Sequence, residues 1–457
     1  MVSIDSSVCF ESNCGVAMAR ILIIHVGNMN NKGTQALLKT DVSVIKELVQ
    51  NVTISVSTTD EEKVKELYPS MAIFPPLIDI PYERADFFAK KTGFSRGSLK
   101  YKVVAFASLI SMLVEVWLCT VSASLCKLGL RPFYRGALLQ TMKESDVVVS
   151  YSDENFKEGA SQLPSNAYWI VSWWTLLLSR TWAVLTVKFF GKPIVMFPNS
   201  VGCFRTWVGR MFARLALNRF DRILIREPRS NETVKSLGIR VPIMMTSDTT
   251  LLLKASGKPF RLDLQGPVIG VSIGVYSHTY SEKGLRKFVE ANAEALDAAI
   301  EKYGLNVVFL PHNVTGFRYD DFEVSKLVME RMRHKERARI VNGLTVEEFK
   351  SYLSQMDMVI SSKMHPGVLA VASFVPALCI AYDDKQSGFF EQLSLSKCVI
   401  SVQDVTAKRL TEKIEYVWNA RNDIRAKLEQ LIPQLQNGTK AAVKQVLAPY
   451  VVLRRKE

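Results

Sequence analysis

The side chains best suited to chemistry follow two apolar runs in the second half of the sequence. Met358–Ser361 is one such run, and Lys363 and His365 come directly after it. The next run, Ala377–Ile380, is followed by Lys385. If both runs are parallel strands, their carboxyl ends meet at one edge of a sheet and bring an imidazole and two ammonium groups together. Such a cluster binds an anion and transfers a proton near neutral pH.

The hydroxyl groups of Ser361 and Ser362 belong to the same predicted anion site, because they end the first of these strands. Free backbone N–H groups at the start of the following helix add to the positive potential there. Asp383 lies two residues before Lys385 and is a candidate base for a hydroxyl group. Asp153, which follows an apolar run in the first half, is a second candidate base.

A glycine- and asparagine-rich loop near the N-terminus predicts a further contact to an anion. Residues 25–33 follow an apolar run and open a helical pattern, and they contain Asn28 and Gly33. Glycine allows the backbone to approach a ligand closely, and a helix N-terminus favours negative charge. The loop lacks the Gly-Lys-Ser/Thr ending of a P-loop. A tight turn without a ligand is the alternative interpretation.

Arg226 stands at the carboxyl end of the apolar run Arg222–Ile225. A guanidinium at this place can hold a carboxylate or a phosphate through two parallel hydrogen bonds. The alternative is a structural ion pair with Glu227 or Asp248. The sequence leaves both interpretations open.

Two further histidines follow apolar runs and are predicted to lie on the acceptor side of the site. His312 follows the run at 307–310, and His278 follows the run at 268–273. The histidines of the chain form no H-E-x-x-H pattern or similar arrangement, so we expect no metal site.

Strand-like apolar runs alternate with helical patterns in both halves of the chain, which is typical of parallel sheets covered on both faces. We therefore predict an α/β fold with two Rossmann-like domains that face each other across a cleft, as in the glycosyltransferase-B architecture. The predicted parts are a loose leader (1–17), a first domain (18–252), a linker (253–267), a second domain (268–403), and C-terminal helices with a basic tail (404–457).

The composition restricts the class of protein. The chain has 457 residues, a net charge of +14 and a mean hydropathy of +0.09. A basic chain favours anionic partners, but no zinc-finger spacing or aromatic–basic RNA signature is present, so we expect no nucleic acid. Seven scattered cysteines indicate a reducing compartment. We expect a cytoplasmic protein that is peripheral on the inner face of a membrane.

Two apolar stretches within the first domain, at 99–130 and 166–190, predict contact with an anionic membrane surface. Val103–Cys126 carries one charged residue, Glu115, and as a helix of about 36 Å it would be long enough to cross a bilayer. The second stretch contains four tryptophans and Arg180. A central charge argues against a simple span, whereas flanking cations suit in-plane docking. Buried helices and true spans remain as alternatives.

The motifs together resemble the polysaccharide pyruvyl transferase family. Asn28–Leu38 is similar to its Asn-x-Gly-x-x-Ala-Leu loop and helix, and Arg226–Gly238 to its Arg-Asp-x-x-Ser segment. Ser361–Ala370 is similar to its Ser-x-Arg-Met/Leu-His block, and Val375–Phe389 to its Val-Pro…Tyr-Asp-x-Lys…Gly-Phe block. The resemblance covers roughly 20–75 and 143–400.

The resemblance implies transfer of a pyruvyl group from phosphoenolpyruvate, as a ketal, onto a saccharide, without a cofactor. It also implies donor-binding or catalytic roles for His365, Lys385 and Arg226. The membrane-facing stretches suggest that the acceptor is a lipid-linked glycan.

Two departures from the family pattern keep other functions open. Lys363 stands where the family has arginine, which keeps the charge but loses the bidentate fork. The family's Gly-Gly-Asp stretch appears as residues 151–155 without its glycines. A nucleotide-sugar-dependent glycosyltransferase of the same architecture and a non-catalytic membrane-associated binding protein are the alternatives.

Overall fold

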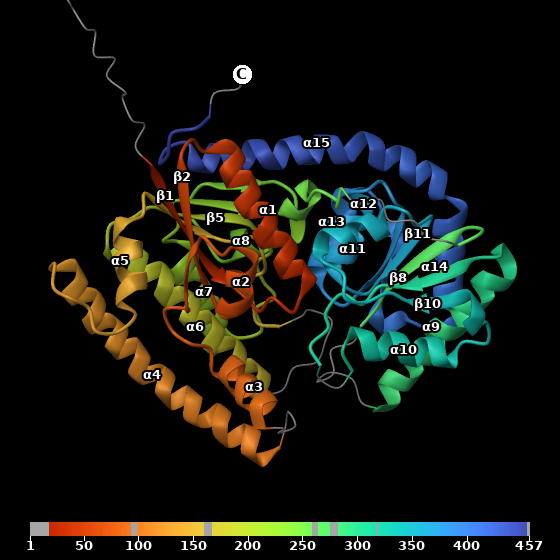
Figure 1. Ribbon diagram of the computed structural model, residues 1–457, viewed down its shortest axis with the longest axis horizontal. Helices are drawn as coiled ribbons and strands as arrows, with labels where there is room; N and C mark the ends of the chain where they lie inside the picture. The colour runs from red at the N-terminus through yellow and green to blue at the C-terminus, as the bar shows by residue number, and fades with distance from the viewer. Residues whose placement is uncertain are drawn as a thin grey trace, which may run out of the picture.

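Two parallel β-sheets, each covered by helices on both faces, lie side by side in the computed structural model (Figure 1). The structure describes residues 18–92, 98–159, 167–257, 264–274, 282–316 and 319–454. The predicted leader at 1–17 and part of the predicted linker lie outside these residues. The fold confirms the predicted pair of Rossmann-like domains.

The first domain is built on a sheet of seven parallel strands in the order β3-β2-β1-β4-β5-β6-β7. Its central strands contain continuous buried apolar runs, such as Ile21–Ile24 and Val147–Val149, as expected for strands that are covered on both faces. The strands are β1 (Ala19–Val26), β2 (Val52–Thr58), β3 (Ala72–Phe74), β4 (Val147–Ser150), β5 (Ile194–Asn199), β6 (Arg222–Ile225) and β7 (Ile243–Met245).

The second domain repeats this plan with six parallel strands in the order β10-β9-β8-β11-β12-β13. In both sheets the strand order reverses beside the first strand of the domain, and ligands of such folds bind in the crevice at that point. The strands are β8 (Val268–Ser272), β9 (Asn306–Phe309), β10 (Ala338–Ile340), β11 (Met358–Ser361), β12 (Ala377–Ala381) and β13 (Val399–Ser401).

Helices connect the strands and cover both faces of each sheet. In the first domain they are α1 (Lys32–Leu48), α2 (Glu61–Leu67), α3 (Pro81–Thr92), α4 (Leu99–Lys127), α5 (Gly136–Glu144), α6 (Ala167–Phe189), α7 (Trp207–Leu217) and α8 (Pro228–Ser236). In the remainder they are α9 (Glu282–Tyr303), α10 (Asp321–Arg331), α11 (Val346–Leu353), α12 (Met364–Val371), α13 (Asp384–Gln392), α14 (Ala407–Asn419) and α15 (Arg421–Leu447).

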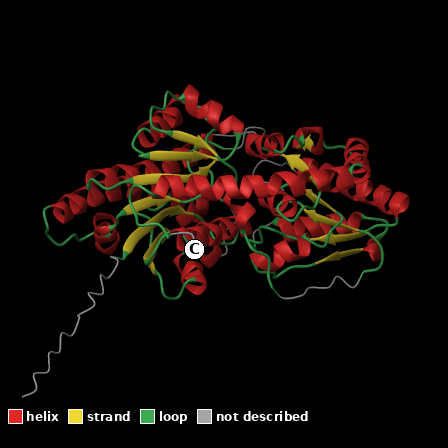
Figure 2. Cartoon of the chain, turned by 90° about the horizontal axis from the view of Figure 1, so that it is seen from above, coloured by secondary structure: helices red, strands yellow, loops and turns green. Residues whose placement is uncertain are grey.

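Helix α15 joins the two domains. Its first half packs into the core of the second domain through Ile424 and Leu428, and its last turns pack into the core of the first domain through Val443 and Val446. Figures 1 and 2 show it lying across both domains. The C-terminal segment thus fixes the relative position of the two sheets, beyond its predicted role as terminal helices.

The apolar stretch at 166–190 differs from its predicted role as a membrane-docking insert. It forms α6, the crossover between the parallel strands β4 and β5, and such a connection requires an element that packs back onto the sheet. Leu177, Val184 and Val187 are completely buried under the sheet, and Trp174 donates to Glu158 at 2.6 Å. The described side chains of this stretch therefore serve mainly the core of the first domain.

Candidate active site

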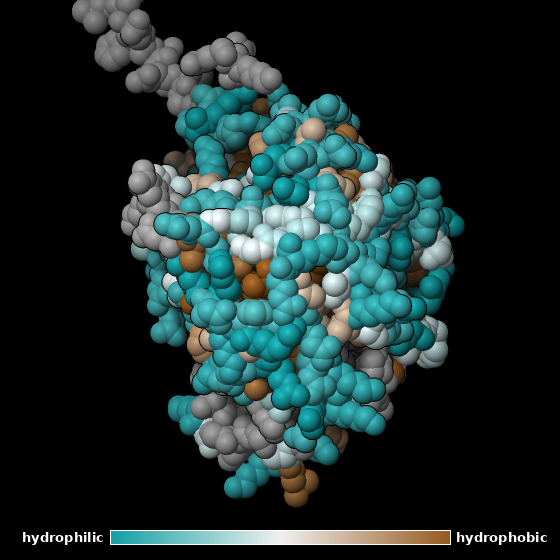
Figure 3. All heavy atoms as spheres, turned by 90° about the vertical axis from the view of Figure 1, so that its right-hand side faces the viewer, coloured by the Kyte–Doolittle hydropathy of each residue, from teal (hydrophilic) through white to brown (hydrophobic). Residues whose placement is uncertain are grey.

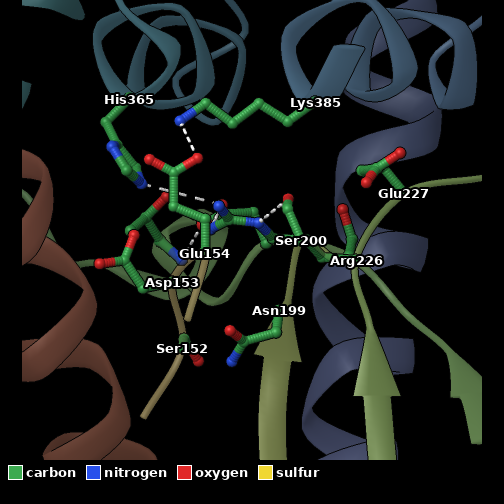
Figure 4. A network of polar contacts seen from close by, with 12 residues as sticks. Ser152, Asp153, Glu154, Asn199, Ser200, Arg226, Glu227, His365 and Lys385 are labelled. Atoms are coloured by element: carbon green, nitrogen blue, oxygen red, sulfur yellow. Dashed lines mark hydrogen bonds and ion pairs between the residues drawn. The ribbon is translucent and has the colours of Figure 1, made fainter. Parts of the chain in front are cut away.

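Loops from the carboxyl ends of both sheets meet between the domains and place a dense group of charged side chains there. Figure 4 shows His365 and Lys385 of the second domain above Asp153, Glu154 and Arg226 of the first. The structure thus brings together the three side chains that the sequence predicts to be catalytic.

His365 and Lys385 both stand in the first turn of a helix. The sequence predicts helices that begin at Gly367 and Gly388, but the structure begins them at Met364 and Asp384. The difference arises because His365 and Lys385 have no apolar periodicity and resemble loop residues. Since the first N–H groups of a helix carry partial positive charge, these starts strengthen the anion site.

His365 is 7% exposed, and its ring stacks on His312 with 6.2 Å between ring centroids. Its Nε2 atom lies 3.9 Å from Oδ2 of Asp248 and has no hydrogen-bond partner among the described residues. Burial lowers the pKa of His365 to about 4, and Arg226 and Lys385 act in the same direction, against Asp248 and Asp153. The imidazole is therefore neutral at physiological pH, with a nitrogen left for a substrate.

His312 lies behind His365. It is 2% exposed, and neither of its ring nitrogens has a partner in the described part of the chain. Burial lowers the pKa of His312 well below the ordinary value, and the neighbouring His365, Lys32 and Lys363 act in the same direction. His312 is thus a neutral neighbour of His365 and limits where that ring can move.

The N-terminal loop packs closely against the other side of the His365 ring. A β-carbon added to Gly33 would lie 2.1 Å from Nδ1 of His365, so only glycine leaves room for the imidazole. The amide of Gly33 binds Oδ1 of Asn31, which caps α1. Asn28 is exposed and accepts hydrogen bonds from Asn30, so its side chain serves the loop itself.

Lys385 contacts a carboxylate of the other domain. Its Nζ lies 2.5 Å from Oε2 of Glu154, and Nζ of Lys157 lies 2.6 Å from the same oxygen. Lys157 also lies 3.6 Å from Asp383. Burial raises the pKa of Glu154, but the two ammonium groups outweigh it and hold that pKa below its ordinary value. One carboxylate oxygen thus occupies a site formed by two ammonium groups.

Arg226 is 1% exposed and pairs with Asp248 at 2.8 Å between Nη1 and Oδ2. Its Nε donates to Ser200 at 2.8 Å. Its Nη2 is buried and has no hydrogen-bond partner among the described residues. The structure thus contains the ion pair with Asp248 that was one of the two interpretations of Arg226, and Nη2 is not used by that pair.

The remaining predicted residues that the structure describes have hydrogen bonds or ion pairs within the protein. Ser361 binds the backbone of Lys363, and Ser362 exchanges hydrogen bonds with the backbone of Gly274. Both hydroxyl groups therefore shape the loop after β11. Lys363 occupies the N-cap position of α12 without a side-chain capping hydrogen bond, and its Nζ lies 3.7 Å from Oδ1 of Asp321.

The two candidate bases also have partners of their own. Asp153 accepts from the Tyr151 hydroxyl at 2.6 Å, and Asp383 caps α13 through the amide of Asp384. His278 lies outside the described residues.

Sequence reasoning missed Glu154 and Lys157 as members of the site, and it considered Asp248 only as a possible ion-pair partner of Arg226. Glu154 and Lys157 have an indirect signal, because they follow β4 where the family pattern has glycines. For Asp248, the only indication in the sequence is a carboxylate that follows the strand β7. Asp41 supports the same loop from α1, accepting from the backbone and hydroxyl of Ser152 at 2.8 Å, and burial raises its pKa to about 7.

Solved structures with a similar fold include UDP-N-acetylglucosamine 2-epimerases. A putative UDP-N-acetylglucosamine 2-epimerase from Listeria monocytogenes aligns with a TM-score of 0.58 and 14% identity, over 94% of this chain and 96% of that one. The epimerase from Neisseria meningitidis bound to UDP-GlcNAc aligns with a TM-score of 0.55 and 12% identity, over 94% and 100%. These similarities show the glycosyltransferase-B-like fold.

Sequence comparison identifies more specific relatives. The amylovoran biosynthesis protein AmsJ of Erwinia amylovora is 21% identical over 266 residues, which cover 53% of this chain. The match spans 62% of the length of that relative. The family model described as polysaccharide pyruvyl transferase matches residues 31–384, which include all the site residues discussed above except Asn28 and Lys385. The chain belongs to the polysaccharide pyruvyl transferase family.

Proposed function

We propose that this protein transfers a pyruvyl group from phosphoenolpyruvate onto a saccharide, as a ketal, in polysaccharide biosynthesis. One observation carries the proposal: two ammonium groups from different domains hold one carboxylate oxygen near a neutral imidazole whose Nε2 has no hydrogen-bond partner among the described residues. Phosphoenolpyruvate has a carboxylate and a phosphate on one small carbon frame, so a donor of this kind suits a cleft lined with cations.

The reaction requires two carbon–oxygen bonds to form and one to break. A sugar hydroxyl oxygen adds to C2 of the enol while the methylene carbon gains a proton and becomes a methyl group. The bond from C2 to the phosphate oxygen then breaks, and a second hydroxyl of the sugar adds to C2. Its proton leaves with the phosphate, so that atoms and charges balance.

The neutral state of His365 fits the first of these steps. An imidazole with a pKa of about 4 is ready to accept the proton of a sugar hydroxyl. The imidazolium so formed can pass that proton to the methylene carbon of the donor. Lys385, Lys157 and Nη2 of Arg226 are the groups that would hold the anionic donor and its leaving phosphate.

Glu154 occupies the place where we expect an anionic oxygen of the donor. Replacing Glu154 with glutamine is expected to lower the KM for phosphoenolpyruvate several-fold, because the donor no longer displaces a paired carboxylate. Lys157→Met is expected to raise that KM. Steady-state release of phosphate measures both, and Glu412→Gln, the same change at an exposed position of α14, is the control. A Glu154→Gln variant with an unchanged KM and a greatly reduced kcat would assign Glu154 to the acceptor instead.

Gly33 is predicted to set the position of His365. Gly33→Ala is expected to reduce kcat by about 10²-fold, because the added methyl group displaces the imidazole from its reactive position. Gly27→Ala is the matched control in the same loop, since a β-carbon there meets nothing within 4 Å. Equal kcat values for the two variants would show that the placement of His365 does not depend on Gly33.

Ligand-induced stabilisation distinguishes the proposed function from its alternatives. We expect phosphoenolpyruvate at about 100 times its Kd to stabilise the folded protein by about 2.7 kcal/mol, and UDP-N-acetylglucosamine to leave the midpoint of thermal unfolding unchanged. A shift with the nucleotide sugar alone would favour a glycosyltransferase. No shift with either compound, together with binding to vesicles, would favour a non-catalytic membrane protein.

A further inference from the structure

Helix α4 presents a long apolar face that no described part of the chain covers. Six large side chains at helical spacing along it are between 52% and 65% exposed: Val103, Phe106, Ile110, Leu113, Val114 and Trp117. The turn after the helix adds Leu128, Leu130 and Phe133, which are 56–75% exposed. In Figure 1 the helix runs along the outside of the first domain. We call these nine residues the α4 face.

The opposite side of α4 packs against the protein and contains the only carboxylate of the helix. Glu115 is 6% exposed and lies 2.5 Å from Arg84. It also accepts from the amide of Asp79 and the hydroxyl of Tyr134, both at 3.0 Å. The central charge of this stretch, which argues against a simple membrane span, therefore points inward, and the exposed side of the helix is free of carboxylates.

Cations flank the α4 face at both ends. Lys100 and Lys102 are exposed at its beginning, and Lys127 and Arg131 are exposed at its end. Between residues 87 and 143 the sequence contains no acidic residue except Glu115. The surface around the α4 face is thus apolar in its centre and positive at its ends.

We propose that the α4 face docks in the plane of an anionic lipid surface. Large apolar side chains enter the boundary between headgroups and acyl chains, Trp117 among them, and the flanking cations bind anionic headgroups. The proposal does not depend on the reaction catalysed. A bound enzyme would meet its acceptor at the inner face of a membrane, which suits a lipid-linked glycan.

A membrane span fits the contacts of α4 less well. Among the described residues, α4 and α6 are the two helices long and apolar enough to cross a bilayer. A spanning α4 would carry Glu115 and its partners Arg84 and Asp79 into hydrocarbon, or leave them unpaired, at considerable cost. In-plane docking leaves this ion-pair network and the packing of α4 against α3 intact.

A second copy of the chain is also a poorer occupant of the α4 face than a lipid surface. In a parallel pair, the two copies place Lys100 beside Lys100, and in an antiparallel pair they place Lys100 and Lys102 beside Lys127 and Arg131. Both arrangements bring cations together without an exposed carboxylate on either face. An anionic bilayer is complementary in charge along the whole face.

Co-sedimentation with vesicles tests the proposal on the full chain. We expect binding to phosphatidylglycerol/phosphatidylcholine vesicles that weakens as salt is added, and much weaker binding to phosphatidylcholine alone. The triple variant Phe106→Glu, Ile110→Glu, Trp117→Glu is expected to lose more than about tenfold in affinity for the anionic vesicles. All three side chains are more than half exposed, so an unchanged midpoint of thermal unfolding verifies the fold.

Phe322→Glu is the matched control, because Phe322 is 38% exposed on α10 of the second domain. Figure 3 shows that hydrophilic side chains predominate on the end of the molecule formed by that domain. The control should bind vesicles like the unmodified protein. Equal binding by the triple variant would overturn the proposal. So would a dimer that the triple variant dissociates without any effect on vesicles, since the α4 face would then join two copies.

Discussion

Replacing His365 with alanine is expected to reduce kcat for phosphate release from phosphoenolpyruvate by about 10²–10⁴-fold, the usual contribution of a general acid–base group. The loss should appear in kcat more than in the KM of the donor, because the cations that bind the donor remain. The midpoint of thermal unfolding should change little, since Nε2 of His365 has no hydrogen bond to lose in the described structure.

His334→Ala is the control for this prediction. His334 lies near the surface and pairs with Glu301 at 3.0 Å, outside the cleft. The His334→Ala variant should keep a normal kcat. A His365→Ala variant that retains more than about a tenth of normal kcat would show that the imidazole does not transfer the proton.

The largest expected effect on stability follows from the buried pair of Arg226 and Asp248. Arg226→Ala should lower the free energy of unfolding by about 3–5 kcal/mol, because it leaves the Asp248 carboxylate buried without its cation. The double variant Arg226→Met, Asp248→Asn should recover much of this loss, because it removes both charges. Urea unfolding of the three proteins measures the effect.

The decrease in the free energy of unfolding caused by Arg226→Ala is expected to depend on pH. Burial raises the pKa of Asp248, but Arg226 and the hydrogen bonds of Thr250 outweigh it and hold that pKa below its ordinary value. The pair therefore stabilises the protein above the unfolded pKa of Asp248, about 4, and this contribution is lost as the pH falls through the folded value. The difference between Arg226→Ala and the unmodified protein should be largest above about pH 5. A double variant no more stable than the single one would contradict this account.

The sequence predicts the sheets well because their strands carry a strong local signal. Runs such as Met358–Ile360 and Ala377–Ile380 are apolar throughout, which is the pattern of a strand that is covered on both faces. The short edge strand Val399–Ser401 escapes prediction, because its apolar run of two residues is too short to distinguish a strand from a loop. Local patterns also fail to show what covers a helix, so the exposed α4 and the buried α6 look alike in sequence.

The residues of the site also differ in how well the sequence predicts them. His365 and Lys385 can be predicted because each follows a recognisable strand, and parallel strands bring their carboxyl ends to one edge. The role of Glu154 cannot be predicted in this way, because its partner Lys385 lies 231 residues away in the sequence. The two side chains meet only when the domains face each other. For Arg226, the sequence shows a cation at a strand end, but the choice between ligand and ion pair depends on where Asp248 folds.

The most direct test incubates the purified protein with phosphoenolpyruvate and extracted membrane glycolipids, and analyses the glycolipids by mass spectrometry. We expect a pyruvyl group on the saccharide with the unmodified protein, accompanied by an equal amount of released phosphate. Lys385→Ala and His365→Ala should each abolish both signals. Pyruvyl addition that persists in either variant would contradict the central claim. So would transfer of a sugar from a nucleotide sugar in the absence of phosphoenolpyruvate.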